Sequence, residues 1–500
     1  MSDTGTGGPF ASVAETHSGV VFFVGDRAYK LKKPVRFGFL DFATREAREA
    51  ICHREVELNR RLAPDVYLGV ADVVGPDGQP LDHLVVMRRL PAERCLATLV
   101  SSGTAVEGDL RHLARLLAAF HAGADTSPEI EAAAGRDALA LRWEANAKEM
   151  ARFVGPVLDR DTSQQVTSLA RRYLDGRAPL FAARLADGRA RDGHGDLRAE
   201  DIFCLDDGPR VLDCLEFDDR LRWDDVLGDV AFLAMDLEHL GHPELAARFL
   251  ADYREFAADV WPASLAHHHI AYRAQVRSKV ACLRWEQGDQ PSADEARHLL
   301  AMAAAHLEAA RVRLIVVGGL PGTGKSTLAA GIGESLDAVV MRSDVVRKQL
   351  AGLAPTTAAP AGLGEGLYRP DMTAETYAAL LARARTCLVN GESVVLDASW
   401  NDPAWRDAAA ALGLETLADL VELRCVAPPE VVESRIAARH ERGGDPSDAT
   451  AAVARAMAAA ESPWPTATIV DTTPRPKEVL RAALRHLAAD VPALPPPARG

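Results

Sequence analysis

The chain has 500 residues, of which 48% are hydrophobic and 26% charged, so it is a folded protein with room for two or three domains. Its formal net charge of -14 argues against a broad nucleic-acid or anionic-membrane surface and makes small molecules the expected partners. No segment approaches the roughly 18 uninterrupted apolar residues of a membrane span, and residues 1–8 do not begin a signal peptide. Seven cysteines without a C-x-x-C pair predict buried thiols in a reducing compartment, so a cytoplasmic protein is expected.

Short strands and one helix are expected in the N-terminal part. The expected elements are strands at 20–24 and 27–32 around a Gly25-Asp26 turn, a charged helix at 44–62, and strands at 66–74 and 84–87. Helices then dominate 108–185 and 223–310. Between them, strands at 202–205 and 211–215 meet at the turn Asp206-Asp207-Gly208-Pro209.

Histidines in the helical part invite a metal assignment. His267, His268 and His269 are consecutive, and neighbours on a helix diverge by about 100°, so the three cannot close on one ion. We expect them at the surface. His121, at the end of a helix over 110–121, is expected to be a buried helix-end residue.

A loop and hairpin between the two helical stretches carry a chemically specific set of carboxylates. In His194-Gly195-Asp196, the Asp196 carboxylate can accept a hydroxyl proton, while Asp201 and Asp213 can meet across the hairpin to hold Mg2+ on the phosphates of ATP. Phosphoryl transfer needs positioning and charge neutralisation more than covalent chemistry. The segment resembles the aminoglycoside phosphotransferase and choline kinase group, whose loop reads H-G-D-x-x-x-x-N. The resemblance implies that Asp196 is the catalytic base and Asp213 a metal ligand, with Asp201 in place of the family's Asn.

The same resemblance implies a lysine that grips the α- and β-phosphates and a helix glutamate that orients it. Lys30 and Glu55 fit these roles, and strand alternation puts Lys32 on the same face as a second choice. A plain surface charge is the alternative for Glu55. The glycine-rich cover loop is reduced to Thr16-His17-Ser18-Gly19, and 87–90 falls where the adenine-contacting hinge is expected.

Further carboxylates follow the hairpin. Glu216 is either a spare carboxylate near the metal or a solvated strand-end charge, and Asp229, by the resemblance, supports the backbone of the catalytic loop. Four more form either an acidic acceptor face for a cationic substrate or an ordinary solvated face: Asp218, Asp219, Asp224 and Asp225.

The run from Gly319 to Ser326 matches the phosphate-loop pattern G-x-x-x-x-G-K-[ST], between a strand expected at 312–317 and a helix at 327–336. Lys325 can reach the β- and γ-phosphates, Ser326 can hold Mg2+, and the helix N-terminus adds a favourable dipole. The predicted nucleotide contacts are Gly319, Gly322, Thr323, Gly324, Lys325, Ser326 and Thr327.

Two strands after this loop end in acidic residues. A strand at 338–341 leads into Asp344, which can deprotonate an acceptor hydroxyl, and Arg347 lies one helical turn further on, where it can orient the acceptor or a phosphate. An ordinary N-cap is the alternative for Asp344. The strand at 394–396 ends in Asp397, the Walker B position, where a carboxylate meets Mg2+ or helps to place the acceptor.

Arg435 and Arg439 lie on a helix that follows 425–429, where they suit a lid that closes over the triphosphate. A solvated helix face is the alternative. These features resemble the polynucleotide kinase, gluconate kinase and zeta-toxin group.

The expected fold is α/β and α+β in two domains. Residues 12–309 form a two-lobed kinase-like fold with an antiparallel sheet lobe and a helical lobe, 310–488 form a parallel-sheet P-loop fold covered by helices on both faces, and 489–500 are a disordered tail. The expected function is ATP-dependent transfer of the γ-phosphate to a hydroxyl of a small polar metabolite or antibiotic, with Mg2+ in both sites. The alternatives are one catalytic domain beside a nucleotide-binding regulator, and an interaction module without turnover.

Overall fold

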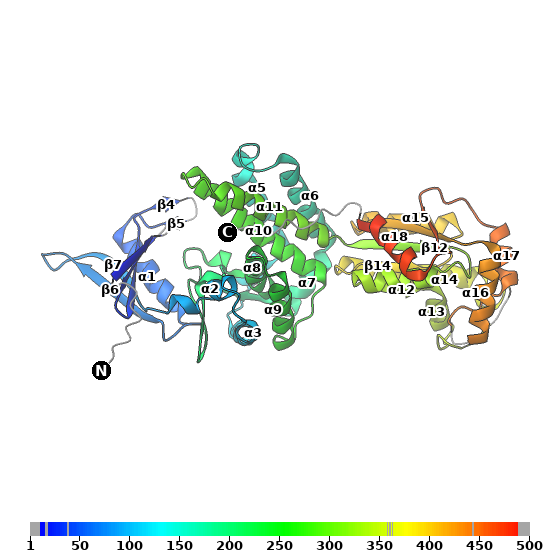
Figure 1. The fold of residues 1–500 in the computed structure, drawn as a ribbon, viewed down its shortest axis with the longest axis horizontal. Coiled ribbons are helices and arrows are strands. Elements are labelled where there is room, and N and C mark those ends of the chain that lie inside the picture. Colours follow the sequence, from blue (N-terminus) through cyan, green and yellow to red (C-terminus); the bar gives the residue numbers. More distant parts are fainter. Residues whose placement is uncertain are drawn as a thin grey trace.

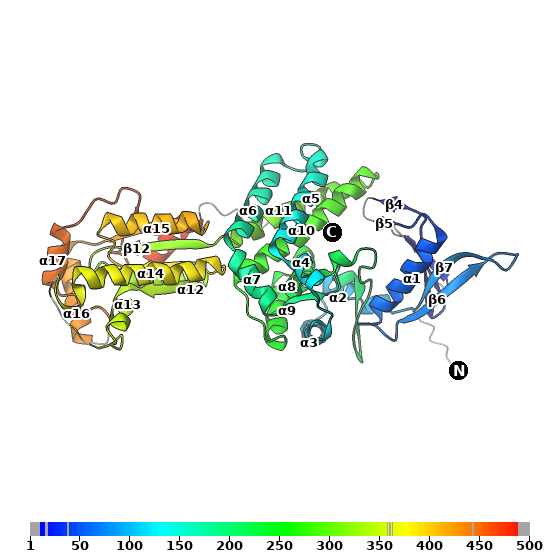
Figure 2. The same cartoon turned by 180° about the vertical axis from the view of Figure 1, so that it is seen from behind.

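The computed structural model describes residues 11–15, 19–37, 40–357, 359, 362, 364–442 and 445–488. The expectations for Thr16, His17 and Ser18 of the cover loop and for the tail at 489–500 lie outside these residues. Figures 1 and 2 show three parts in a row: a small sheet lobe, a helical lobe and a second sheet wrapped by helices. Within the described residues, no helix combines the length and the apolar character needed to cross a bilayer.

The sheet lobe is an antiparallel sheet with one long helix packed on it. Its strand order is β1 (Ala11–Glu15), β2 (Gly19–Val24), β3 (Arg27–Lys32), β7 (Pro80–Arg88), β6 (Tyr67–Val74), and the helix is α1 (Arg45–Asn59). A two-residue ladder, β4 (Arg36–Phe37) with β5 (Leu40–Asp41), lies between β3 and α1 in the chain. Thr44 caps α1, because its Oγ1 accepts a hydrogen bond from the amide of Ala47 at 3.1 Å. Alternate residues of β3 are buried against α1.

The helical lobe holds the largest part of the core. Its helices are α2 (Leu96–Ser101), α3 (Glu107–Gly123), α4 (Pro128–Ala134), α5 (Arg136–Met150), α6 (Arg160–Gly176), α7 (Ala178–Ala186), α8 (Val226–His239), α9 (Pro243–Phe256), α10 (Ala263–Glu286) and α11 (Ser292–Ala309). Two short ladders join them, β8 (Ala190–Asp192) with β11 (Trp223–Asp225) and β9 (Ile202–Leu205) with β10 (Gly208–Val211).

The range predicted for the second strand of the hairpin is wrong by several residues. It spans Gly208–Val211 instead of 211–215, so Asp213 follows the strand. The reason is that the backbone beyond Val211 bonds to the sheet lobe: the amide of Asp213 donates to Tyr67 Oη at 3.1 Å and that of Cys214 donates to Asn59 Oδ1 at 2.9 Å.

The expectation that the three consecutive histidines lie at the surface is also wrong. His268 and His269 are fully buried, because α10 is enclosed by other helices. His267 Nδ1 lies 2.9 Å from Nδ1 of His306 on α11, and the ring of His268 stacks on Tyr173 of α6. Burial lowers the pKa of His267 to about 4 and that of His268 well below its ordinary value. The three side chains diverge, as the helical geometry requires.

The C-terminal part is an all-parallel sheet with helices on both faces, as the sequence predicts. The strand order is β13 (Val339–Arg342), β14 (Val394–Asp397), β12 (Arg313–Gly318), β15 (Asp419–Val426), β16 (Thr468–Asp471). The helices are α12 (Lys325–Leu336), α13 (Ser343–Leu350), α14 (Pro370–Val389), α15 (Pro403–Glu415), α16 (Pro429–Arg442), α17 (Ala451–Ala459) and α18 (Pro476–Ala488). Ile315 and Val317 of β12 join the core under α12 and α18, while Leu314 and Val316 join the core that continues into the helical lobe.

The helical lobe meets the amino ends of the parallel strands. Ser264, at the start of α10, donates a hydrogen bond to the carbonyl of Gly391 at 2.7 Å, and Arg177 donates to the carbonyl of Thr416 at 2.7 Å. Arg172 pairs with Asp419, the first residue of β15, at 2.7 Å. Because parallel strands run in one direction, the carboxyl ends of these strands, and the phosphate loop that follows β12, point away from the helical lobe.

Candidate functional sites

In the N-terminal site, one glutamate joins two lysines. Lys30 Nζ lies 2.9 Å from Glu55 Oε1, and Lys32 Nζ lies 2.5 Å from Glu55 Oε2. The Glu55 side chain is 0% exposed, so the alternative of a surface charge is wrong. Burial alone would lower the pKa of Lys30, but Asp213 and Glu55 raise it well above its ordinary value. Lys30 and Glu55 are therefore an ionised, buried pair, and Lys32 is a second cation bound to the same glutamate.

The two lysines also reach across to the helical lobe. Lys30 pairs with Asp213, and Lys32 Nζ lies 2.6 Å from Glu216 Oε1. Glu216 is largely buried, so the alternative of a solvated charge is wrong. Asp213 has a φ of 60°, a left-handed conformation that costs free energy in a residue other than glycine and is found mostly where function requires it. Burial would raise the pKa of Asp213, but the charges of Lys30 and Lys32 hold it below its ordinary value.

The loop that carries Asp196 is held by its backbone. Both Asp229 oxygens accept hydrogen bonds at 2.8 Å, one from the amide of His194 and the other from that of Gly195. His121 is buried, as expected, and its Nε2 lies 3.0 Å from Asp229 Oδ2. A side chain at Gly195, which has a φ of 88°, would place its Cβ 3.0 Å from Arg222. The Asp196 carboxylate itself is partly exposed.

Arg198 is the residue that sequence reasoning missed here. Its Nη2 lies 3.0 Å from Asp201 Oδ2, its Nε lies 3.4 Å from Asp196 Oδ2, and it also pairs with Glu200. The only available signal was its place inside the loop motif, three residues before Asp201. Burial raises the pKa of Asp201 well above its ordinary value in spite of Arg198.

The charges of this site fit a divalent cation. Its carboxylates outnumber its cations: Glu55, Asp196, Glu200, Asp201, Asp213 and Glu216 against Lys30, Lys32 and Arg198. Asp201 Oδ2 is buried and accepts no hydrogen bond. The described residues contain no group of three or more His, Cys, Asp or Glu with metal-binding geometry. A Mg2+ ion here would therefore take two carboxylates, Asp201 and Asp213, and complete its shell with phosphate and water oxygens.

The four acidic residues after the hairpin do not form a single face, because two of them are buried. Each is in an ion pair with arginine: Asp218 with Arg220, Asp219 with Arg54 and Arg222, Asp224 with Arg142 and Arg273, and Asp225 with Arg184. Asp224 and Asp225 are buried. The pairs of Asp224 and Asp225 belong to the interior, while Asp218 and Asp219 are partly exposed and are already paired with arginine.

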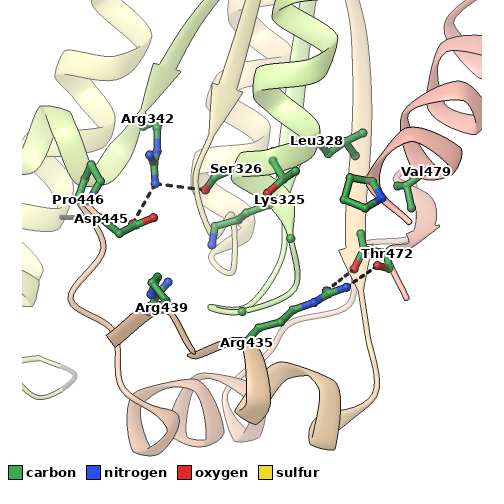
Figure 3. Close-up of a pocket in the computed structure, with 14 residues that line it drawn as sticks. Lys325, Ser326, Leu328, Arg342, Arg435, Arg439, Asp445, Pro446, Thr472 and Val479 are labelled. Atoms are coloured by element: carbon green, nitrogen blue, oxygen red, sulfur yellow. Dashed lines mark hydrogen bonds and ion pairs between the residues drawn. The ribbon is translucent and has the colours of Figure 1, made fainter. Parts of the chain in front are cut away.

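In the C-terminal site, the phosphate loop wraps the entrance of a cavity of about 620 Å³ (Figure 3). Of the predicted nucleotide contacts, the residues that line it are Gly322, Gly324, Lys325, Ser326, Thr327, Arg435 and Arg439. Gly319 and Thr323, which belong to the same loop, do not line the cavity, and Thr323 Oγ1 donates to the carbonyl of Leu320 at 2.8 Å. A Cβ on Gly319 would lie 2.6 Å from the carbonyl oxygen of Cys425, so only glycine fits there.

Asp397 lies behind the residues that line this cavity, next to Arg342, and fits a metal ligand. Its carboxylate is buried at the end of β14, and its Oδ1 accepts no hydrogen bond. Burial raises its pKa, against the charge of Lys325 and a hydrogen bond from Ser326. Ser326 and Asp397 are thus the protein oxygens that would hold Mg2+ on a nucleotide.

Asp344 and Arg347 form an ion pair of 2.7 Å within α13. Asp344 lies inside the first turn of that helix, and Arg342 is the N-cap, so the alternative of an N-cap aspartate is wrong. The Arg347 guanidinium lies 4.7 Å from the centre of the Tyr368 ring. The pair is a carboxylate with a fixed cation beside it, which suits a base and an orienting group.

The two predicted lid arginines face the cavity. Arg435 donates to the carbonyl of Thr472 at 2.7 Å, and Arg439 donates to the carbonyl of Ala449 at 2.6 Å. Figure 3 places both beside the loop that carries Lys325, so the alternative of a solvated helix face is wrong. Sequence reasoning missed two further charged side chains that line the cavity, Arg342 and Asp445.

Comparison with known proteins follows the same division of the chain. A model named phosphotransferase enzyme family matches residues 14–267, and an AAA domain model matches residues 314–463. Uncharacterized proteins of Mycobacterium tuberculosis and Mycobacterium bovis are each 44% identical over 476 residues, 95% of either chain. Among solved structures, a choline/ethanolamine kinase family protein from Mesorhizobium loti is 14% identical, covers 61% of this chain and 94% of its own, and has a TM-score of 0.38. A gluconokinase from Sinorhizobium meliloti is 20% identical, covers 36% and 93%, and has a TM-score of 0.27.

Proposed function

The chain belongs to the phosphotransferase enzyme family over residues 14–267, with an AAA domain after it, and we propose that it is an ATP-dependent kinase that phosphorylates a hydroxyl of a small polar metabolite or antibiotic. The observation that carries the proposal is the contact of the buried Lys30 with both Glu55 and Asp213. It brings the proposed phosphate-binding lysine and the proposed metal ligand together from two lobes, which phosphoryl transfer requires. We place the boundary between the two domains near residue 310 and the protein in the cytoplasm.

In the proposed reaction, Asp196 accepts the proton of the acceptor hydroxyl, and its loop stays in place because Asp229 holds two of the backbone amides. Lys30 and Arg198 neutralise phosphate charge, while Asp201 and Asp213 are the residues that would hold Mg2+. When bound, Mg2+ supplies charge neutralisation on the phosphates.

The AAA domain is proposed to be a second ATP site with its own acceptor. Lys325 and the loop amides bind the phosphates, and Ser326 and Asp397 are the residues that would hold Mg2+. Asp344 accepts the hydroxyl proton, and Arg347 orients the acceptor. Arg435 and Arg439 close over the nucleotide. The alternative is that only one domain catalyses and the other binds nucleotide as a regulator.

The test is ADP release by the full-length protein against a panel of hydroxyl acceptors, with Asp196→Asn and Asp344→Asn compared. We expect each variant to abolish transfer to one set of acceptors, by about 10²- to 10⁴-fold, because each removes one base. Asp218→Asn is the matched control in the first domain, since its partner within the described residues is the exposed Arg220. Transfer that survives one of the two substitutions on every acceptor supports the alternative, and no ADP release from any acceptor refutes the kinase proposal.

A further inference from the structure

Arg342 is the last residue of β13, and it lies beside the Walker B residue. The parallel register pairs Arg342 with Asp397 at the carboxyl ends of neighbouring strands. Its side chain points toward Ser326 and Asp445, as Figure 3 shows, and it lines the same cavity as Lys325. An arginine at this place meets any phosphate that the loop binds.

The Arg342 guanidinium contacts both residues that would hold Mg2+. Its Nη2 donates to Ser326 Oγ at 3.4 Å, and its Nε lies 3.3 Å from Asp397 Oδ2. The Nε contact is a charge contact without an aligned hydrogen bond, because Arg342 Nε has no hydrogen-bond partner. The two oxygens that a cation would share are thus already shared by a guanidinium.

The same guanidinium also contacts the segment that follows the lid helix. Arg342 Nη2 lies 3.3 Å from Asp445 Oδ1, and Figure 3 draws this contact and the one to Ser326 from a single side chain. Asp445 in turn accepts a hydrogen bond from the amide of Ser447 at 2.9 Å. A second ion pair binds this segment nearby: Lys348 Nζ lies 3.0 Å from Asp448 Oδ2, and Lys348 touches neither Ser326 nor Asp397 in any contact of the described residues.

We propose that Arg342 is a positioning residue that couples the metal ligands of the P-loop site to its lid, because one guanidinium serves Ser326, Asp397 and Asp445 together. The inference rests on the proposed ATP site of the AAA domain. Arg342 competes with a divalent cation for Ser326 and Asp397. When a cation displaces the guanidinium from these two residues, the guanidinium stays bound to Asp445 and moves toward the phosphates with it. Metal, nucleotide and lid position then depend on one another through this side chain.

The test uses full-length protein with Asp213→Asn in every sample, so that metal uptake reports the P-loop site. Mn2+ binding without nucleotide is measured by electron paramagnetic resonance. We expect Arg342→Gln to tighten Mn2+ binding roughly tenfold, because a competing charge within 4 Å is gone. Arg342→Lys should keep most of the competition. Lys348→Gln is the matched control, since it breaks the other ion pair of the lid segment and leaves the metal ligands alone.

Lid position is read by hydrogen exchange of the backbone amides of residues 445–450 in the same proteins. Arg342→Gln, Asp445→Asn and Lys348→Gln should all speed exchange, but only Arg342→Gln and Asp445→Asn, which break the Arg342–Asp445 contact, should also remove the protection that Mg·ATP analogue adds. If Arg342→Gln and Lys348→Gln agree in both readouts, Arg342 is only a tether and the proposal is overturned. If Lys325→Ala leaves nucleotide binding unchanged, the proposed ATP site fails, but the Mn2+ comparison still tests Arg342.

Discussion

The two nucleotide sites hold their charged groups by opposite means. In the N-terminal site, buried side chains from two lobes neutralise each other, with Glu55 between Lys30 and Lys32. In the P-loop site, one loop of backbone forms the cradle, and the cavity is lined by more cations than carboxylates: Lys325, Arg342, Arg435 and Arg439 against Asp445. The first site is acidic and assembled from distant segments, while the second is basic and its phosphate cradle is a single contiguous loop.

The difference in charge between the two sites indicates what each site needs before ATP can bind. A triphosphate is repelled by an excess of carboxylates, so the N-terminal site requires a divalent cation to accept it. The P-loop cavity attracts phosphates with its own cations and with the amides at the start of α12. Metal dependence should therefore separate the two sites.

Metal removal is the largest expected effect. With EDTA in place of Mg2+, we expect nucleotide affinity at the N-terminal site to fall roughly 100-fold or more, and at the P-loop site only about tenfold, because only the latter keeps a net positive lining. Isothermal titration of full-length protein with an ATP analogue measures both, and Lys325→Ala identifies the P-loop component. Equal losses at the two sites would break the comparison.

Stability should distinguish the sites next. Glu55→Gln leaves two buried lysines without their shared counter-charge, so we expect a loss of about 3–5 kcal/mol in the free energy of unfolding of the sheet lobe. Lys325→Ala, in the other site, should change the free energy of unfolding by less than about 0.5 kcal/mol, because Lys325 forms no ion pair among the described residues. Chemical denaturation measures both. A small effect of Glu55→Gln would mean that Lys30 and Lys32 are neutralised by Asp213 and Glu216 alone.

The pH dependence of stability should also distinguish the N-terminal site, through the buried carboxyl of Asp201. Burial raises its pKa well above the ordinary value, so the folded protein keeps this proton at pH values where the unfolded chain has lost it. The stability of the wild type that comes from Asp201 therefore falls as pH rises from about 4 toward the raised value. The Asp201→Asn variant has no carboxyl to ionise at this position and therefore does not lose this stability as pH rises. Its melting temperature without metal should exceed that of the wild type more at pH 8 than at pH 5. A difference that does not change with pH contradicts the raised pKa.

The smallest effect is expected at the join between the domains. Ser264→Ala removes the hydrogen bond to the carbonyl of Gly391 and should cost about 0.5–1.5 kcal/mol in unfolding free energy. Nucleotide affinity at both sites should stay the same, because the join lies at the amino ends of the parallel strands, away from the phosphate loop. A change in affinity at either site, measured by titration, would show that the sites communicate.

The architecture and the position of both sites could be predicted from the sequence, but the side-chain network could not. The phosphate loop and its flanking strand and helix are contiguous, so pattern alone places Gly319 to Ser326. The double role of Glu55 depends on how α1 packs against β3, and the contacts of Arg198 and Arg342 depend on which carboxylates the fold brings to them. No local pattern carries that information.

The errors have the same origin. The second hairpin strand ends early because Tyr67 and Asn59 of the other lobe take the amides of Asp213 and Cys214. His268 and His269 are buried because other helices pack against α10, which a single-helix argument cannot see. In each case tertiary contacts override a sound local expectation.

The close packing at the join between the domains restricts how the two domains can be exchanged during evolution. A Cβ on Gly176 would lie 2.7 Å from the carbonyl oxygen of Thr416, and one on Gly391 would lie 2.8 Å from Ser264 Oγ, so each domain supplies a glycine that the other requires. A recombination event that attached a different P-loop domain would have to reproduce both close approaches at once. Selection against such mismatches favours passing the two domains on as one unit, and a library of exchanged domains should yield folded chimeras only where both glycines are retained.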